Sequence, residues 1–278
     1  MKPLKYLSFL AALILFVSCE EVVEIDLNSS SPTVVVEGNI SAGSTASLHL
    51  SYTSDYFSND QSPDITNAVV TIANSNGESE ILKSAGDGQY VGEKMLGEEN
   101  TTYTISIDLG DKFFEGKSTI LTPSSLVKLQ FEEATFSRPG GGSHFGADAD
   151  SLPEYNIHIQ FTDDLLQENY YMLRIRQGDS INDFSSSLYQ DKFYEDYGMI
   201  SIVPMMYNFK EGDMVNVKIY TIDFDTYNFY NQLSDVSGGG MGMMMMGTPY
   251  NPSSNLGKNV LDYFAAWAII DTTFIVKS

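Results

Sequence analysis

The stretch AVVTIANSNGESEILKS, residues 68–84, decides the fold class. Apolar and polar side chains alternate on both sides of Asn76-Gly77, and alternation with a period of two is typical of a half-buried strand. Asparagine and glycine tolerate the positive φ angles that a tight β-hairpin turn requires. The stretch therefore predicts two antiparallel strands joined at Asn76-Gly77.

Similar strands flank this hairpin. TVVVEGNI (33–40) is rich in β-branched residues, and ASLHLSYT (46–53) places alternate apolar side chains on one face. A further pair of strands is expected at 103–107 and 112–120. About seven short strands at regular spacing are typical of an Ig-like β-sandwich, which we expect over residues 32–122.

The second half of the chain is also rich in predicted strands. Alternating segments occupy 125–136, 154–163 and 169–178, and residues 263–278 predict two β segments that return to the core. We therefore expect a mainly β protein with a second antiparallel β-rich domain over residues 123–278.

One short helix is expected within this second domain, at residues 225–237. Tyr227, Tyr230 and Leu233 are spaced three residues apart and would share one helical face. Asp225 stands where its side chain would cap the helix N-terminus, and for the pair Asp223 and Asp225 in TIDFDTY capping is a simpler account than metal binding.

The chain begins with a segment typical of a secreted lipoprotein. Lys2 and Lys5 precede an apolar run at 7–17 that is too short to span a bilayer comfortably, and Ser18-Cys19 follows. This arrangement resembles a bacterial lipobox, in which the cysteine is diacylated and begins the mature protein. We expect residues 1–18 to be a signal peptide and Cys19 to anchor the chain to a membrane by its acyl chains. An ordinary secretory signal followed by a stray cysteine is the alternative.

The residues behind this cysteine are acidic. Glu20 and Glu21 come directly after it, and Glu24 and Asp26 follow in a tether at 19–31. This pattern resembles the surface-export signal of Bacteroidota lipoproteins, although a solvated acidic tether has the same composition. The formal net charge of −22 repels phosphate groups, so nucleic acid is excluded as a partner.

Several segments together resemble a known family. In their order and spacing they look like the Bacteroidota outer-membrane lipoproteins labelled domain of unknown function 4249. The resemblance implies an N-terminal Ig-like or transthyretin-like sandwich, a second β-rich domain and genomic company with TonB-dependent outer-membrane receptors. It supplies no catalytic residues. The segments that carry it are TVVVEGNI (33–40), NAVVTIANSNGESEILKSAGDGQYVG (67–92), TTYTISIDLGDKFFEGKSTIL (101–121), NYYMLRIR (169–176), GDMVNVKIYTIDFDTYNFYNQL (212–233) and NPSSNLGKNVLDYFAAWAI (251–269).

Residues that could hold a metal ion are scattered. His49, His144 and His158 have no close His or Cys partner of the kind that zinc needs. Asp148 and Asp150 lie in a glycine-rich loop, and Asp163 and Asp164 follow the next strand, so that their oxygens could bind calcium. The EF-hand spacing is absent, which favours a solvated acidic loop. We expect no resident metal and no cofactor.

No catalytic set is evident either. The segment GGSHFG (141–146) has serine beside histidine but lacks the Gly-x-Ser-x-Gly motif. Aromatic clusters such as YNFYNQL (227–233), KFYEDYGM (192–199) and PMMYNF (204–209) fit a core or a face that binds a glycan, peptide or partner. We expect the protein not to be an enzyme, with a hydrolase as the least supported alternative.

The most unusual stretch is GGGMGMMMMG at residues 238–247. Methionine packs on irregular apolar surfaces, and its thioether binds copper(I). Three interpretations stay open: a passive linker, a loop that docks on a partner, and a copper site. The residues concerned are Met241, Met243, Met244, Met245 and Met246.

The sequence thus predicts an outer-membrane, surface-exposed lipoprotein that acts as a non-enzymatic accessory to a TonB-dependent receptor, by capturing substrate or capping the receptor. The alternative is a surface lipoprotein that captures copper(I) or another metal with its methionine-rich loop.

Overall fold

The protein is a mainly β structure, as predicted, with one α-helix in the part of the chain that is described. Residues from Pro32 to Ser278 form one compact unit. The computed structural model describes residues 31–54, 62–133, 154–164, 168–178, 186–193, 195–196, 198–204, 209–237 and 250–277.

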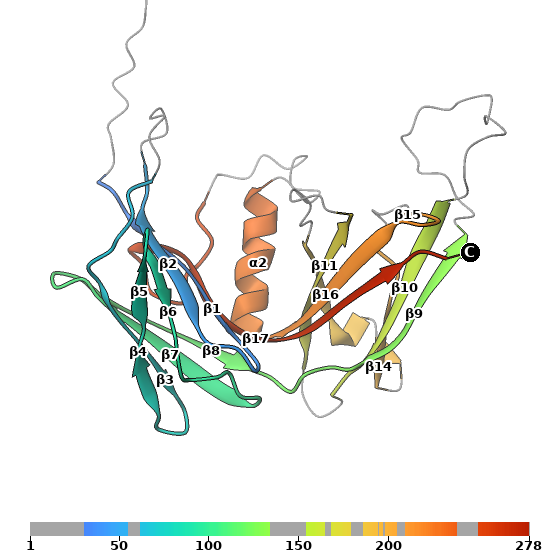
Figure 1. Ribbon diagram of the computed structural model, residues 1–278, viewed down its shortest axis with the longest axis horizontal. Coiled ribbons are helices and arrows are strands. Elements are labelled where there is room, and N and C mark those ends of the chain that lie inside the picture. Colours follow the sequence, from blue (N-terminus) through green and yellow to red (C-terminus); the bar gives the residue numbers. More distant parts are fainter. Residues whose placement is uncertain are drawn as a thin grey trace, which may run out of the picture. The chain divides into compact units, whose positions relative to one another are not determined.

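The largest sheet has eight strands, with the order β12-β11-β16-β17-β1-β2-β6-β5 (Figure 1). It joins strands from the beginning, the middle and the end of the chain, so both predicted domains contribute to it. Its strands are β12 (Ser186–Gln190), β11 (Tyr170–Gln177), β16 (Met214–Ile222), β17 (Val260–Ile275), β1 (Val34–Ser41), β2 (Ser47–Tyr52), β6 (Gln89–Val91) and β5 (Lys83–Gly86).

A second sheet, of four strands, packs on the part of the first sheet that contains β1 and β2. The hairpin predicted at Asn76-Gly77 is confirmed by the antiparallel pairing of β3 with β4. Gly77 takes a positive φ of 90°, while the Asn74 side chain accepts the N–H groups of Asn76 and Glu78 and so fixes the turn. The strands of this sheet are β4 (Ser79–Ile81), β3 (Val69–Asn74), β7 (Thr101–Asp108) and β8 (Phe113–Ile120).

A hydrophobic core fills the space between these two sheets. Alternate side chains of β1, β2, β3 and β7 enter it, including the fully buried Leu48, Leu50 and Ile105. This β-sandwich is the one that alternation in the first half predicts.

A third sheet lies on the other end of the eight-stranded sheet. Its core is separate and receives alternate residues of β10, β11 and β16, such as Phe161, Tyr171 and Val217. Its strands are β13 (Glu195–Asp196), β14 (Met199–Ile202), β10 (Glu154–Thr162) and β15 (Phe209–Lys210), with β9 (Leu126–Glu133) paired to β10. A short 3-10 helix, Asp191–Phe193, follows β12.

Strand β17 connects the two ends of the eight-stranded sheet (Figure 1). Residues 260–267 pair parallel with β1, and residues 268–275 pair antiparallel with β16. The sequence predicts two β segments here and assigns them to the second domain. The structure instead forms one strand of 16 residues, and its first half supplies Val260, Phe264 and Ala266 to the first core.

The predicted helix is present as α2 (Phe224–Val236), but its cap differs from the prediction. Asp223, and not Asp225, is the N-cap, because its carboxylate accepts the N–H of Thr226 at 2.8 Å. The buried face also differs, since Phe229 is only 3% exposed whereas Leu233 is 37% exposed. Tyr227 and Tyr230 do pack beside Phe229, as their spacing predicts.

Polar contacts fix α2 and the segment before β17 onto the sandwich. The second carboxylate oxygen of Asp223 accepts the Ser118 hydroxyl and the Thr119 N–H of β8, both at 2.8 Å. Asn255 donates to the carbonyls of Lys117 and Phe264, both at 2.8 Å, and accepts the N–H of Phe264. These contacts position the helix and β17, both of which line the polar pocket on this face of the sheet.

Candidate functional site

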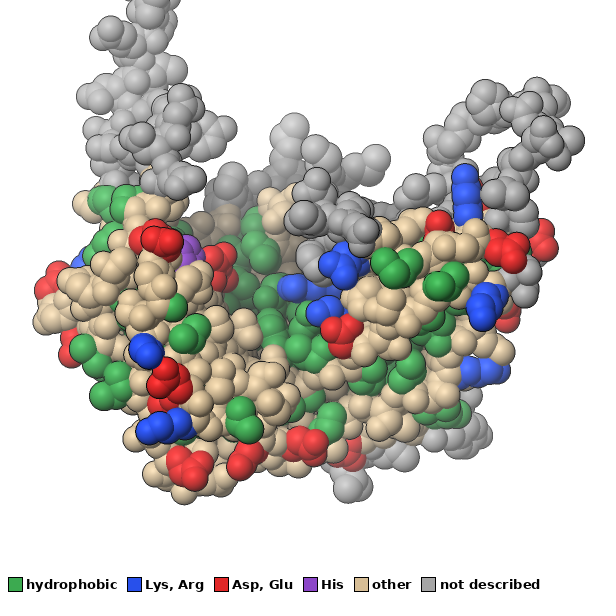
Figure 2. All heavy atoms as spheres, viewed as in Figure 1, with side chains coloured by type: hydrophobic (Ala, Val, Ile, Leu, Met, Phe, Trp, Pro, Cys, Tyr) green, Lys and Arg blue, Asp and Glu red, His purple; other side chains and the backbone are tan. Residues whose placement is uncertain are grey.

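A polar pocket of about 390 Å³ lies on the face of the eight-stranded sheet that carries α2. Its walls come from β1, β11, β16, β17 and α2, so side chains that are far apart in the sequence converge on it. Figure 2 shows a hollowed part of the surface in which basic and hydrophobic side chains gather. Pockets of this size hold small molecules.

The side of the pocket formed by β11 carries a cation on aromatic rings. The Arg174 guanidinium lies 5.3 Å from the centre of the Tyr220 ring and 5.9 Å from that of Tyr230. A guanidinium group over a tyrosine face is attracted by the negative charge of the ring face. The two rings therefore hold Arg174 in a defined place at the pocket wall.

Trp267 links β17 to β1 at the pocket wall. Its indole N–H donates to the Ser41 hydroxyl at 2.9 Å, and its ring packs edge-on against Tyr220 at 5.0 Å between centroids. Tyr263 stacks on Phe229 of the helix at 4.8 Å. These buried rings form a rigid wall, because each is held by a neighbour on another element.

The pocket lining also includes two carboxylates, Glu37 from β1 and Asp262 from β17. Burial, followed by the negative charge of Glu37, raises the pKa of the Asp262 carboxyl group to about 6. No ion pair joins Asp262 to a cationic side chain among the described residues.

The backbone at Asp262 is unusual. Its φ is +70°, in the left-handed region that residues other than glycine rarely adopt. In the pairing of β1 with β17, Asp262 stands opposite Val36, whose side chain is fully buried in the first core. A regular strand would therefore point Asp262 into that core. With the left-handed backbone, the residue lines the pocket together with Glu37.

His49 contacts one of these carboxylates, Glu37. Its two ring nitrogens lie 3.2 Å from Glu37 and 3.1 Å from Asp64. Burial alone would lower the pKa of His49, but the hydrogen bonds and charges of these two carboxylates outweigh it and raise the pKa above its usual value. His49 thus orients Glu37 at the pocket rim.

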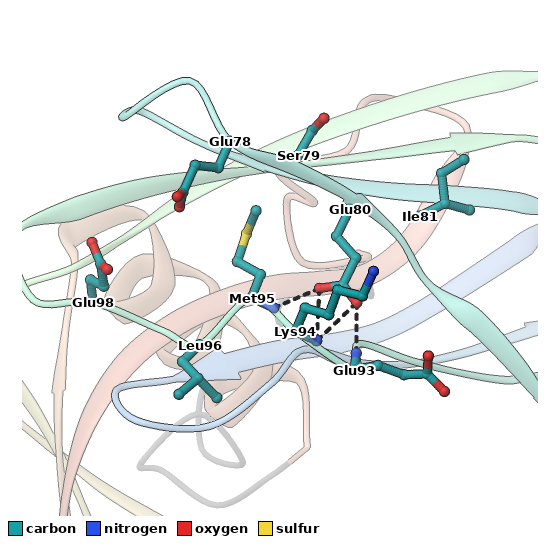
Figure 3. Close-up of a pocket in the computed structure, with 9 residues that line it drawn as sticks. All are labelled: Glu78, Ser79, Glu80, Ile81, Glu93, Lys94, Met95, Leu96 and Glu98. Atoms are coloured by element: carbon teal, nitrogen blue, oxygen red, sulfur yellow. Dashed lines mark hydrogen bonds between the residues drawn. The ribbon is translucent and has the colours of Figure 1, made fainter.

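A second, larger pocket of about 660 Å³ lies between β4 and residues 93–98 (Figure 3). Its acidic side chains already have structural partners. The Glu80 carboxylate accepts the N–H groups of Glu93, Lys94 and Met95, at 2.7, 3.0 and 2.7 Å. Although burial would raise the pKa of Glu80, these N–H groups lower it below its usual value.

Other acidic groups around this second pocket are also engaged. Glu78 accepts from Asn74, and Glu93 pairs with Lys83 at 3.1 Å. These carboxylates fix loops to strands. The pocket that contains Arg174 is therefore the better candidate for a functional site.

The structure brings few of the sequence-predicted site residues together. Cys19, Glu20 and Glu21 lie outside the described residues, as do His144 and the loop from Met241 to Met246, so the predictions made for them stay predictions. His158 is described, and its ring lies 3.3 Å from Glu132 on the neighbouring strand β9.

Sequence reasoning missed most of the pocket. The spacing of the tyrosines places Tyr230 on a helical face. Glu37, Arg174 and Asp262 stand in three separate segments, and no motif connects these segments with one another. The signal available in the sequence was the pair Arg174 and Arg176 within the largely apolar and aromatic strand NYYMLRIR, which is an unusual place for a cation.

Metal and membrane features were searched in the described part of the chain only. Within it, no group of three or more His, Cys, Asp or Glu side chains is arranged to hold a metal ion. Among the same residues, no helix has both the length and the apolar character needed to cross a membrane.

The described elements define the chain as a β-sandwich protein with a polar and aromatic pocket beside its single described α-helix. It belongs to the family described as domain of unknown function, DUF4249, whose model matches residues 20–272. The family resemblance seen in the sequence is thereby confirmed.

Other comparisons add little. No curated protein matches the chain. A solved two-domain fibronectin type-III segment from chicken tenascin is similar at 13% identity, over 69% of this chain and 92% of that chain, with a TM-score of 0.21.

Proposed function

We propose that this chain is a non-enzymatic binding lipoprotein of the outer membrane that faces outward and serves as an accessory to a TonB-dependent receptor. Its task would be to capture a small substrate in the pocket beside α2 and to deliver it to the receptor. The observation that carries the binding role is the convergence of Arg174, Glu37 and Asp262 with aromatic side chains of β16, β17 and α2 in one pocket.

The contacts within the site favour binding over catalysis. His49, which a hydrolase would need as a base, is held between the carboxylates of Glu37 and Asp64. Ser41 accepts the hydrogen bond of Trp267. Nucleophilic catalysis by a serine requires its hydroxyl to contact the base that activates it. Ser41 and His49 instead contact Trp267 and the two carboxylates.

The location rests on the sequence. The lipobox that ends at Cys19, with Glu20 and Glu21 behind it, supports an exported and lipid-anchored protein. The match to the family begins directly after this cysteine, at residue 20. The resemblance noted in the sequence supports a TonB-dependent receptor as the partner.

Co-purification from native membranes tests the proposal. We expect a β-barrel receptor to be recovered with the tagged protein in mild detergent, and a membrane-impermeant reagent to label the protein on intact cells. A Cys19→Ser variant should lose both properties because it lacks the anchor. Recovery of the wild-type protein alone, or labelling only after the cells are broken, would contradict the proposal.

A further inference from the structure

The pocket of about 660 Å³ between β4 and residues 93–98 lies beside the free edge of a sheet. Strand β4 is the outermost strand of the four-stranded sheet and, among the described strands, pairs only with β3. The facing wall is the segment formed by residues 93–98 (Figure 3). We call the space between these two walls the β4 groove.

The pairing of β4 determines which of its backbone groups are open. The carbonyl of Glu78 accepts an N–H of β3 at 2.9 Å, and the N–H of Leu82 donates to a carbonyl of β3 at 2.8 Å. Successive residues of an antiparallel strand direct their backbone groups to alternate sides. The N–H and carbonyl groups of Ser79 and Ile81 therefore point away from β3, and both residues line the groove. Among the described residues no strand pairs with this edge.

Apolar side chains are open to solvent along the β4 groove. Ile81 on one wall is 69% exposed, and Leu96 on the other wall is 53% exposed. Met95 also lines the groove, and methionine adapts to irregular apolar partners. Exposed apolar side chains beside an unpaired strand edge form the kind of surface to which an extended peptide adds as a further strand.

The β4 groove is also strongly acidic. Its charged lining residues are Glu78, Glu80, Glu93, Glu98 and Lys94. Among the described residues, only one of the four carboxylates takes part in an ion pair, that of Glu93 with Lys83 at 3.1 Å. The groove therefore presents an excess of negative charge to any chain that enters it.

Hydrogen bonds hold the other carboxylates in place. Glu80 accepts the N–H groups of three successive residues of the facing wall. Glu78 accepts from the Asn74 amide at 2.7 Å, and Glu98 accepts from the Asn76 amide at 3.1 Å. Because these donors are uncharged, the bonds orient the carboxylates without cancelling their charge. The anionic surface is thus preorganised, and little further ordering is needed when a ligand binds.

Charge distinguishes the chains that could pair with this edge. A second copy of the protein would bring the same glutamates to β4, and like charges that face each other destabilise a strand pair. An extended segment in which basic and apolar residues alternate has neither defect. One face of such a segment presents cations to the glutamates, and the other presents apolar side chains to Ile81 and Leu96.

We propose that the β4 groove binds an extended segment of a partner protein in which lysine or arginine alternates with apolar residues, and that this segment adds to the four-stranded sheet as a new edge strand. Its backbone pairs with Ser79 and Ile81, and its cationic side chains lie against Glu78 and Glu98. This interaction surface shares no lining residue with the pocket beside α2 and goes beyond the proposed function.

Fluorescence polarisation of short labelled peptides tests the proposal on the full-length protein in mild detergent. The probe is a hexapeptide in which lysine and valine alternate, and we expect a Kd of about 100 µM or lower. The same peptide N-methylated at alternate residues keeps its charge but cannot pair along its backbone, so its binding should be weaker by about tenfold or more. A peptide with glutamate in place of lysine should not bind.

Variants with matched controls locate the binding on β4. Ser79→Pro removes an outward N–H at the first residue of the strand, where proline is tolerated, and should weaken the lysine peptide by about tenfold. Glu98→Gln should weaken it by about two- to fivefold. The control Glu115→Gln makes the same charge change on β8, at the opposite edge of the same sheet, and should have no effect.

A third pair of variants addresses the apolar contact. Ile81→Thr keeps a β-branched residue in the strand but shortens the apolar surface, and should weaken the lysine peptide by about threefold or more. The control is Phe113→Thr, because Phe113 is 62% exposed on β8. Equal effects of the two variants would contradict the placement on β4.

The remaining outcomes are equally decisive. Equal binding of the plain and the N-methylated peptide on the wild-type protein would show adsorption by charge alone and overturn strand addition, whether or not the proline variant folds. Failure of the lysine peptide to bind, or equal binding of the glutamate peptide, would also overturn it. A wild-type dimer in sedimentation analysis that Ser79→Pro abolishes would assign the edge to a second copy instead. None of these results bears on the pocket beside α2 or on co-purification of the receptor, so the proposed function is tested separately.

Discussion

Replacing Asp223 by alanine removes one contact that caps α2 and two contacts that tie the helix to the sandwich. One carboxylate oxygen caps the helix through the N–H of Thr226. The other accepts the Ser118 hydroxyl and the Thr119 N–H of β8. Ser118 is itself only 3% exposed and accepts the N–H of Ala266 on β17, so the network reaches the strand that both cores share.

The expected cost follows from these contacts. Loss of an N-cap side chain costs about 1 kcal/mol. The Thr119 N–H and the Ser118 hydroxyl lose a charged acceptor in a largely buried place, which adds about 2 kcal/mol. The total of about 3 kcal/mol should lower the melting temperature by about 6–12 °C for a chain of this size.

Urea unfolding measures this loss, with the fluorescence of Trp267, the only tryptophan, as the signal. Asp225→Ala is the matched control, because Asp225 is exposed in the first turn of the same helix and contributes only through the helix dipole, by about 0.5 kcal/mol. Equal destabilisation by the two variants, or a loss below about 1 kcal/mol for Asp223→Ala, would refute the reasoning.

Three further predictions concern single side chains, each measured by urea unfolding. Asn255→Ala should destabilise the protein by about 2 kcal/mol, since three hydrogen bonds to β8 and β17 are lost. The control Asn259→Ala, at an exposed residue, should cost less than about 0.5 kcal/mol. Equal losses of stability in the two variants would refute the role of Asn255 as a bridge between the strands. Glu80→Gln should cost about 1–2 kcal/mol at pH 7, because a charged acceptor of three N–H groups becomes neutral. The pKa of Glu80 is lowered in the folded state, so the stabilisation by its carboxylate exists above the unfolded pKa and disappears as the pH falls through the folded pKa. A difference in stability between the variant and the wild type that persists at pH 2 would contradict this role of the charge. Asp262 has a folded pKa of about 6, above its unfolded value, so its ionisation destabilises the fold as the pH rises from about 4 to above 6. After discounting for partial exposure, Asp262→Asn should therefore be more stable than wild type by about 1–2 kcal/mol at pH 7, with the gain vanishing near pH 4; a gain that does not depend on pH would show that the charge of Asp262 is not its cause.

The strands and the helix could be predicted because their signals are local. The alternation in β1, β2, β7 and β10 places one face of each strand in a core, and the spacing of the tyrosines identifies α2. The cap was misassigned by two residues because Asp223 and Asp225 are both plausible caps in sequence. Only the contacts with β8, more than a hundred residues earlier, distinguish them.

Strand β17 was harder to interpret. From Tyr263 to Ala268 every residue is buried, since this part lies between the first core and the helix and loses alternation. From Ile269 to Ile275 exposed and half-buried residues alternate again. The change from continuous apolar residues to alternation predicts two separate β segments. In the structure the same change occurs within one strand, whose two halves lie in different environments.

The pocket could not be predicted for a related reason. Its charges come from β1, β11 and β17, which only the order of the eight-stranded sheet brings together. The left-handed backbone that places Asp262 there is set by the packing of its neighbours and has no signature in the sequence. Local patterns specify elements, and the site depends on their long-range arrangement.

The most direct test of the binding role is mass spectrometry of the small molecules released by denaturing the protein after its isolation from native membranes. The wild-type protein should release a small molecule, and an Arg174→Gln, Asp262→Asn double variant should release at least about tenfold less of it. Identical compounds in equal amounts from both proteins would contradict the assignment of the pocket beside α2 as the binding site.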